Sequence, residues 1–506
     1  MMESLQTKET VQTVGSRSFK AGDVVLCCEP LVWALERSAY KTRCVFCLQR
    51  SQDLRSCSGC KLHRYCSKVC QTADWKMEHK LECALLKTAT GGSMEATGGP
   101  SGSSMQYFLK TPRELIVKLA NKLKLNPMSD IPGIGRKSAR ELWHMLPSHP
   151  RLGLVETTME IAANPNRPMD IALTDVVEYY SNVDHNAVPI LDTVNDPAPI
   201  GIAVYPLASP RLMTPVCWDK NVLCSFRGRR LIIHAMEDIP NYTGLKDLRY
   251  NNMPEPYHLT RAERRVLFEN LHGYPCNCRK CTPEYEADIN PLKCITVGCA
   301  NRIPSDIRAL QPCIECGALN KERLKEYRHF MAQYEAIKAR FPEGFCSAMH
   351  LLVDLCKKLD AVGIVQPGAH LRYMCGWELP QILYKENRFE EGWKMTQELI
   401  VFMRDVYPKY DYFRAMRLSL AGVSSAACLK QLVEEQIGRL SAKNRQKLKS
   451  MSDQACAVIS DYCREASDIL RRLYGENSKE TIKDNSMIAL AHAIVRDIEK
   501  AFRDRK

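Results

Sequence analysis

Apolar residues recur near every 3.6 positions through the last third of the chain, which is the period of an amphipathic helix. Six segments follow this pattern over several helical turns. They are residues 321–341, 347–359, 371–389, 391–407, 413–431 and 455–474. The pattern predicts antiparallel helical hairpins stacked one on the next.

Earlier in the chain the pattern changes to short runs rich in β-branched residues, with turn residues between them. Residues 201–206 form one run, and residues 222–235 hold two more around Arg227-Gly-Arg229-Arg230. These runs predict a small, mostly antiparallel β domain. We interpret the arginine cluster as a solvated hairpin and not as a phosphate contact. A proline near its start and helical spacing predict an amphipathic helix over residues 111–123.

Residues 44–83 carry eight potential metal ligands at regular spacing. The pattern is Cys44-x2-Cys47-x9-Cys57-x2-Cys60-x5-Cys66-x3-Cys70-x8-His79-x3-Cys83. Seven thiolates and one imidazole suit two tetrahedral zinc ions. A segment this short cannot fold on its own core, so metal binding should supply most of its folding free energy. The spacing therefore predicts structural zinc.

This segment resembles the MYND zinc finger, most closely in Tyr65-Cys66-Ser67-Lys68-Val69-Cys70-Gln71 and in the Trp75-Lys76 and His79-Lys80 pairs that follow. The resemblance implies two ligand sets. They are Cys44, Cys47, Cys66 and Cys70 for one zinc ion, and Cys57, Cys60, His79 and Cys83 for the other. MYND modules bind short proline-containing peptides. Trp75 is then either the peptide contact or packing for the short helix against the zinc core.

The segments on the two sides of the finger, residues 19–26 and 107–281, make sense together, so the finger reads as an insertion. The order of the pieces resembles the SET and MYND domain family of protein-lysine methyltransferases over nearly the whole chain. Besides the finger, the best-matching pieces are the run at 201–206, Arg261-Ala-Glu263-Arg264-Arg265 and Cys276-x-Cys278-x2-Cys281.

The resemblance implies an α+β fold: a SET β-fold split by a MYND zinc finger insertion, a cysteine-rich post-SET zinc region, and an α-helical, tetratricopeptide-like C-terminal domain. The expected boundaries follow the sequence. They are 1–43 for the N-terminal part of the SET domain, 44–83 for the finger, 84–105 for a flexible linker, 106–265 for the SET insert and core, 266–320 for the post-SET region with an extra ribbon, and 321–506 for the helical domain.

Two more zinc sites are expected outside the finger. In the family, the post-SET triplet is joined by a cysteine of the core SET motif, which gives the set Cys217, Cys276, Cys278 and Cys281. The extra ribbon carries a further set at Cys294, Cys299, Cys313 and Cys316. Four thiolates form a closed structural site. For the ribbon, the alternative interpretation is four unrelated buried cysteines.

The methyl donor of the family is S-adenosylmethionine, which the protein binds and aligns. The family opens with a Gly-x-Gly turn that lets the backbone approach this cofactor, but these positions hold Thr10-Val11-Gln12. The second family motif, Asn-His-Ser-Cys, reads Thr214-Pro215-Val216-Cys217 and loses both polar side chains. At roughly 1 to 3 kcal/mol for each lost hydrogen bond, cofactor binding should weaken by about one to four orders of magnitude.

Three positions keep residues of the family site. Asn186 matches an asparagine that contacts the cofactor, and Tyr274 matches the aromatic residue that packs against its adenine. Tyr250 falls where the catalytic tyrosine of the family should be. Each of the three also fits ordinary packing in the fold, so an active enzyme stays open.

Composition adds the cellular setting. The chain has 506 residues, of which 45% are hydrophobic, enough for several domains. A polar start and the lack of a long apolar run argue against secretion and a membrane span. Many of the 24 cysteines stand in C-x2-C pairs, which favours metal ligation in the cytoplasm or nucleus. The net charge of +13 is spread along the chain, which argues against nucleic-acid binding.

We therefore expect a monomeric zinc protein that binds protein partners through its finger and its helical domain. Its methyltransferase activity should be weak or lost, and its setting should be chromatin regulation. The alternative is an active S-adenosylmethionine-dependent enzyme that methylates histone or non-histone lysines and holds a lysine-bearing segment in its cleft. The helices, in the simplest interpretation, only cover apolar surface of the SET domain.

Overall fold

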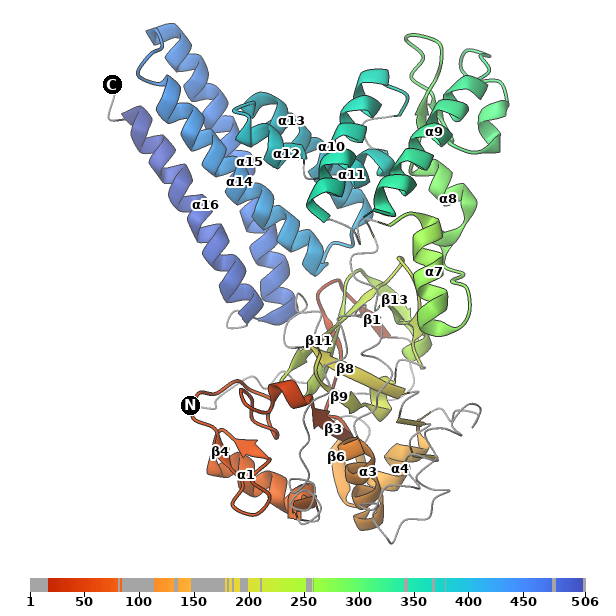
Figure 1. Cartoon of the computed structure of the whole chain (residues 1–506), viewed down its shortest axis with the longest axis vertical. Coiled ribbons are helices and arrows are strands. Elements are labelled where there is room, and N and C mark those ends of the chain that lie inside the picture. Colours follow the sequence, from red (N-terminus) through yellow and green to blue (C-terminus); the bar gives the residue numbers. More distant parts are fainter. Residues whose placement is uncertain are drawn as a thin grey trace. The chain divides into compact units, whose positions relative to one another are not determined.

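The computed structural model describes most of the chain, in two compact units (Figure 1). The described residues are 17–80, 82–83, 113–131, 135–146, 178–179, 182–183, 186–191, 199–209, 212–251, 257, 259–340, 345–365, 369–377, 379–475 and 479–503. The first unit comprises Met1–Pro215 and Val222–Tyr250, and the second comprises Val216–Asn221 and Asn251–Lys506. The expected linker, residues 84–105, lies outside the described residues.

Two three-stranded antiparallel sheets form the centre of the first unit. One has the order β11 (Val222–Arg227), β12 (Arg230–Ala235), β2 (Val24–Cys28), and the other has the order β3 (Val32–Leu35), β9 (Pro199–Val204), β8 (Ala187–Leu191). In both sheets a strand from before the finger pairs with a strand from after it. This arrangement confirms the predicted β-fold with the finger as an insertion.

Shorter ladders complete the unit. β1 (Arg17–Phe19) pairs with β13 (Ile239–Tyr242), and β6 (Met128–Ile131) pairs with β7 (Gly135–Ser138), in both cases antiparallel. β10 (Thr214–Pro215) and β14 (Arg249–Tyr250) run parallel. The prediction of a mostly antiparallel domain is therefore confirmed for the described strands.

Strand β3 is buried on both faces, as its continuous apolar sequence favours. Successive side chains of a strand point to opposite faces, so Trp33 and Leu35 join one core cluster while Val32 and Ala34 join another. The second cluster includes α3 (Arg113–Leu125) and α4 (Ala139–His144). The helix predicted over residues 111–123 is confirmed as α3.

The finger consists of a short hairpin of β4 (Arg55–Ser56) and β5 (Arg64–Tyr65), then α1 (Lys68–Asp74) and a π-helical turn over Trp75–His79. Ser67 accepts a hydrogen bond from the Cys70 N–H at 3.2 Å and so caps the start of α1. The apolar residues of the finger belong to the same cluster as the sheets. The finger therefore shares its core with the β-fold.

One arginine joins the finger to the sheets. The Arg229 guanidinium lies 4.3 Å from the ring centroid of Trp33 and 4.2 Å from that of Phe46. It donates hydrogen bonds to the Phe46 carbonyl at 3.0 Å and to Glu29 at 2.8 Å. The interpretation of the arginine cluster as a solvated hairpin holds for the exposed Arg227 and Arg230 but was wrong for Arg229, because its flat, weakly hydrated guanidinium packs against two aromatic rings.

Gly228, the residue before Arg229, also lies against the finger. Gly228 has φ +62°, a left-handed conformation at the β11–β12 turn. A Cβ atom at this position would lie 2.5 Å from the carbonyl oxygen of Cys47, one of the candidate metal ligands of the finger. The turn thus lies directly against the backbone of the zinc finger.

The second unit is mainly helical. Its helices are α7 (Arg261–His272), α8 (Pro283–Asp288), α9 (Lys321–Lys338), α10 (Phe345–Val362), α11 (His370–Gly376), α12 (Leu379–Lys385), α13 (Phe389–Val406), α14 (Tyr412–Gln436), α15 (Ala442–Tyr474) and α16 (Lys479–Arg503). The last three lie side by side (Figure 1). Within the described ranges, no helix is long and apolar enough to span a membrane.

The predicted helical domain is confirmed, with three differences. Residues 371–389 form no single helix, because α11 ends before Pro380 and α12 begins there, where a proline fits the first turn. Helix α15 begins at Ala442, earlier than expected, since its first turns are highly polar and show little apolar period. Helix α16 was not predicted at all.

A buried ion pair fixes the short segment Val216–Asn221 to the helices of its own unit. Lys220 lies 2.9 Å from Asp411, with side chains 7% and 0% exposed. Tyr257 donates a second hydrogen bond to Asp411 at 3.0 Å. Removal of one partner from such a pair leaves an uncompensated buried charge, so the segment and the start of α14 depend on each other.

The contact between Gly228 and the finger gives a direct stability prediction. Gly228→Ala should lower the free energy of unfolding by about 1–2 kcal/mol for the left-handed backbone, with a further loss because the Cys47 carbonyl must move. Gly135→Ala is the matched control, since Gly135 has φ +86° but nothing within 4 Å of its Cβ position. Chemical denaturation followed by tryptophan fluorescence measures both. Equal losses in the two variants would contradict the contact.

Candidate functional site

The structure brings the predicted metal ligands together in four clusters. Within each, the ligand atoms lie within 4.8 Å of one another. The clusters are Cys44, Cys47, Cys66 and Cys70; Cys57, Cys60, His79 and Cys83; Cys217, Cys276, Cys278 and Cys281; and Cys294, Cys299, Cys313 and Cys316. Soft sulfur donors with at most one imidazole fit zinc in closed tetrahedral sites.

The first finger cluster favours a thiolate. Cys66 Sγ lies 3.7 Å from Cys47 Sγ and 3.6 Å from Cys70 Sγ. Hydrogen bonds from the Cys47 thiol and from nearby backbone N–H groups lower the pKa of Cys44 to about 5, against the effect of burial. Because the thiolate is the form that binds metal, the cluster is prepared for a cation.

The second finger cluster contains the histidine ligand. His79 Nε2 lies 3.3 Å from Cys57 Sγ and 3.6 Å from Cys60 Sγ, so this nitrogen faces the thiols. Burial opposes ionisation of Cys57, yet hydrogen bonds from the Cys60 N–H and His79 lower its pKa to about 6. Glu82 lies 4.0 Å from His79 Nδ1, where a carboxylate helps to orient a metal-bound imidazole.

Two further buried residues support His79 and were missed from sequence. The His63 ring stacks on His79 with 4.4 Å between centroids, and Asp74 lies 3.7 Å from His63 Nδ1. Asp74 also accepts a hydrogen bond from Tyr65 at 2.7 Å. His63, Asp74 and His79 lie close enough together to suggest a separate metal site. However, His79 Nε2 faces the thiols and Asp74 is engaged by Tyr65. His63 and Asp74 therefore hold His79 in place, and no spacing of residues in the sequence identifies such a role.

The third cluster joins distant parts of the second unit. Cys217 Sγ lies 2.9 Å from Cys281 Sγ, and the Cys217 N–H donates to Cys276 Sγ at 3.3 Å. A hydrogen bond from the Cys217 thiol holds the pKa of Cys278 well below its usual range. Arg264 on α7 stacks on Trp218, with 4.1 Å from the guanidinium to the ring centroid. Cys217 therefore lies where the family resemblance expected it.

The fourth cluster lies in the small ribbon of β15 (Leu292–Lys293) and β16 (Arg302–Ile303). Cys294 Sγ is 3.5 Å from Cys316 Sγ, and Cys299 Sγ is 3.7 Å from Cys313 Sγ. Asn301 donates a hydrogen bond to Cys313 and lowers its pKa to about 6. The alternative of unrelated buried cysteines is not supported, because all four thiols converge.

The residues at the expected cofactor motifs, unlike the metal ligands, do not form a set of converging polar groups among the described residues. Thr10-Val11-Gln12 lies outside the described residues. Thr214 donates its hydroxyl hydrogen bond to the Lys246 carbonyl at 2.7 Å, and Pro215 has no N–H to donate. Val216 is a buried apolar residue. Of these three residues only Thr214 has a polar side chain, and its hydroxyl is already bonded to the Lys246 carbonyl.

Asn186 is used by the fold. It is fully buried, its Oδ1 accepts a hydrogen bond from Ser209 at 2.6 Å, and its Nδ2 donates to the Asn182 carbonyl at 2.8 Å. The amide of Asn186 thus holds the backbone at Asn182 and the side chain of Ser209 in place. A fixed buried amide of this kind explains the residue without a cofactor.

The two aromatic candidates lie in different units. Tyr250 is 4% exposed in β14, where Pro215 of β10 is its register partner. The expected catalytic tyrosine is therefore next to the altered motif. Tyr274, in the second unit, is 45% exposed and packs edge-on against Phe268 at 5.7 Å.

Residues 44–83 match the MYND finger family. N-lysine methyltransferase SMYD2-B of Xenopus laevis is 38% identical over 419 residues, which cover 78% of this chain and 82% of the relative. SMYD2-A of the same organism is 23% identical over 53% of this chain and 57% of its own length. SET domain-containing protein 14 of Caenorhabditis elegans is 23% identical over 50% and 53%. The chain thus spans about half the length of the latter two.

Proposed function

Because the chain belongs to the SET and MYND domain family, we propose that it is a zinc-held scaffold that binds protein partners and whose methyltransferase activity is weak or lost. One observation carries this proposal. The sets of metal ligands are complete, whereas Thr214, Pro215 and Val216 occupy the positions where the family contacts its cofactor. Selection for folding and binding without chemistry would leave this combination.

The alternative is an active protein-lysine methyltransferase. Its support is the position of Tyr250 on β14 beside β10, together with Asn186 and the methyltransferase names of two relatives. Against it stand the bonded amide of Asn186 and the loss of two polar side chains at the second motif. At about 1–3 kcal/mol each, those losses alone would weaken cofactor binding strongly.

Zinc is proposed to have a structural role at every cluster. Three protein ligands and an open position are typical of catalytic zinc, but each of these clusters offers four protein ligands. The two finger clusters, the post-SET cluster and the ribbon would hold one ion each. Cysteines grouped as metal ligands are typical of a reducing compartment, so we place the protein in the cytoplasm or nucleus. We propose that it acts as a monomer.

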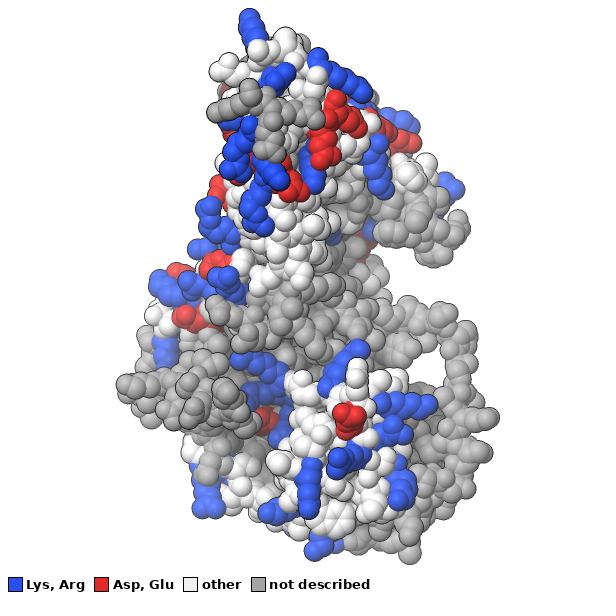
Figure 2. Space-filling view, turned by 90° about the vertical axis from the view of Figure 1, so that its left-hand side faces the viewer, with Lys and Arg blue, Asp and Glu red and all other residues white. Residues whose placement is uncertain are grey.

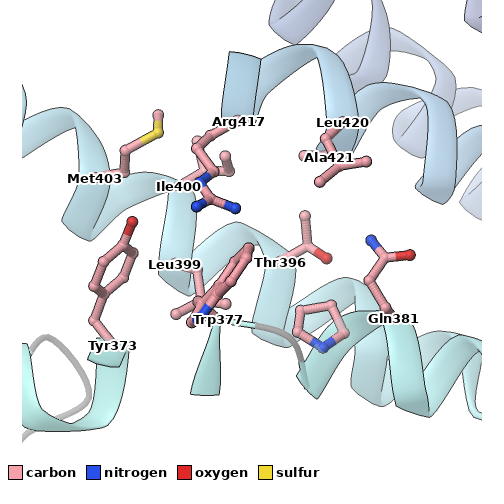
Figure 3. Close-up of a pocket in the computed structure, with 11 residues that line it drawn as sticks. Tyr373, Trp377, Gln381, Thr396, Leu399, Ile400, Met403, Arg417, Leu420 and Ala421 are labelled. Carbon is pink, nitrogen blue, oxygen red and sulfur yellow. The ribbon is translucent and has the colours of Figure 1, made fainter. Parts of the chain in front are cut away.

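A pocket in the helical unit supports partner binding (Figure 3). It is an open pocket of about 60 Å³ among α11 to α14, and its walls are mostly apolar, with Leu399, Ile400 and Met403 contributed by α13. The Arg417 guanidinium lies 3.7 Å from the centre of the Trp377 ring, at the face of the pocket. An apolar side chain of a bound peptide would fit the walls, and the guanidinium could bind peptide carbonyl groups.

Zinc content tests the structural proposal. The purified full chain should carry one zinc ion for each cysteine cluster, measured by plasma mass spectrometry against protein concentration. Cys313→Ser should remove the ribbon ion alone. Cys428→Ser, a half-buried thiol outside the clusters, should leave the content unchanged. An unchanged content in the Cys313 variant would show that the ribbon holds no metal.

Peptide display tests the pocket. Peptides selected on the zinc-loaded chain should bind Ala421→Leu at least about tenfold more weakly, because the larger side chain fills the pocket. Leu490→Ala changes an exposed apolar residue on α16 and serves as the control. If the selected peptides bind the Ala421 and Leu490 variants equally well, the pocket is not the binding site.

Methyl transfer tests the catalytic part of the proposal. With tritiated S-adenosylmethionine and histone or total protein substrates, the chain should transfer no methyl groups above the level of Tyr250→Phe. The phenylalanine keeps the ring buried in β14 and removes only the hydroxyl. Robust transfer that Tyr250→Phe abolishes would establish the active enzyme instead.

A further inference from the structure

The outer surface of the finger is strongly basic. Between residues 41 and 83 the chain has nine Lys and Arg against four Asp and Glu. Two of the acidic residues, Asp74 and Glu82, are 1% and 4% exposed and face the buried histidines. The exposed charge of the finger is therefore more positive than its composition indicates.

Three of the lysines form a row. Lys68, Lys76 and Lys80 are exposed along α1 and the π-helical turn after it, at spacings of four and eight residues that bring them to one side. None of the three makes an ion pair with a carboxylate in the part of the chain that the structure describes. Among the described residues, no carboxylate neutralises these charges, and a row of lysines attracts an anion.

Exposed apolar side chains come from the same helical segment. Val69 is 78% exposed, Trp75 is 42% exposed and Met77 is 39% exposed. The edge of Trp75 also packs near His79, at 5.8 Å between centroids, which fixes the indole relative to the zinc ligands. Large apolar groups held in water are typical of a protein-binding surface.

Figure 2 shows the side of the molecule on which Figure 1 places β4 and α1. In the lower part of that view, blue Lys and Arg side chains are scattered over the described surface with little red among them. White surface lies between the blue side chains. The mixture of cationic and uncharged surface is what a peptide with both acidic and apolar residues would match.

We propose that this basic finger face, formed by Lys68, Val69, Trp75, Lys76, Met77 and Lys80, binds an acidic segment of a partner protein. The MYND resemblance already implies a short, extended, proline-containing segment, and the new element is the requirement for Asp or Glu beside the lysines. The inference rests on the proposed function, since it specifies what the finger binds. A phosphate backbone could use the lysines, but it would leave Val69 and Met77 without a partner.

Fluorescence anisotropy with the zinc-loaded full chain tests this specificity. The probe is a labelled peptide with a Pro-Leu-Pro core and aspartates on both sides, and the comparison peptide has asparagine in place of each aspartate. The aspartate peptide should bind about tenfold more tightly at low salt, and the difference should shrink as salt is added. Because this salt dependence is measured on the unmodified protein, the test stays valid even if a variant loses zinc.

The triple variant Lys68→Gln, Lys76→Gln, Lys80→Gln should remove the preference for aspartate while its zinc content stays normal. The matched control replaces Lys358, Lys443 and Lys447, which are exposed on α10 and α15, by glutamine and should keep the preference. Equal binding of the two peptides would overturn the acidic specificity and leave peptide binding by the finger intact. Absence of binding to both would overturn both ideas, and tighter binding of single-stranded DNA that the triple variant loses would identify a nucleic-acid site instead.

Discussion

The convergence of cysteine thiols into four clusters is the constraint on which the small segments of the fold depend. The finger, the post-SET turn around Cys217 and the ribbon are short segments, and few of their residues can build an apolar core. Without metal, the clustered thiols would also need to share protons in buried surroundings, as the low pKa of Cys44 indicates. One divalent ion removes both difficulties, because it binds four ligands from separate turns and favours their ionised form.

The cysteine clusters alone do not position the finger, and the contact of Arg229 with Trp33 and Phe46 is also needed. The arginine comes from the β11–β12 turn, the tryptophan from β3 and the phenylalanine from the finger, so three distant segments meet at one guanidinium. Gly228 allows the turn to approach the backbone of Cys47. The first metal cluster is thereby packed rigidly against the β-fold. Such packing suits a scaffold that presents the outer face of the finger to a partner.

The zinc clusters of the finger and the ribbon could be found from sequence because their ligands recur at short spacing. Cys217 could not be found that way, since it lies 59 positions before Cys276, with β11 to β14 and α7 between them, and only the family resemblance identified it. Arg229 was misread because charge predicts solvent and says nothing of two aromatic rings that come from elsewhere. The split of residues 371–389 was missed although Pro380 marks it, because apolar period alone continues across the break.

We propose that the metal-binding half of the family site persists while the cofactor-binding half is lost. Titration calorimetry of the zinc-loaded chain with S-adenosylmethionine tests this most directly, because it needs no substrate and measures cofactor binding itself. We expect no heat of binding up to cofactor concentrations near the millimolar range. Saturable binding in the micromolar range would contradict the account, since it would show that Thr214, Pro215 and Val216 still complete a working cofactor site.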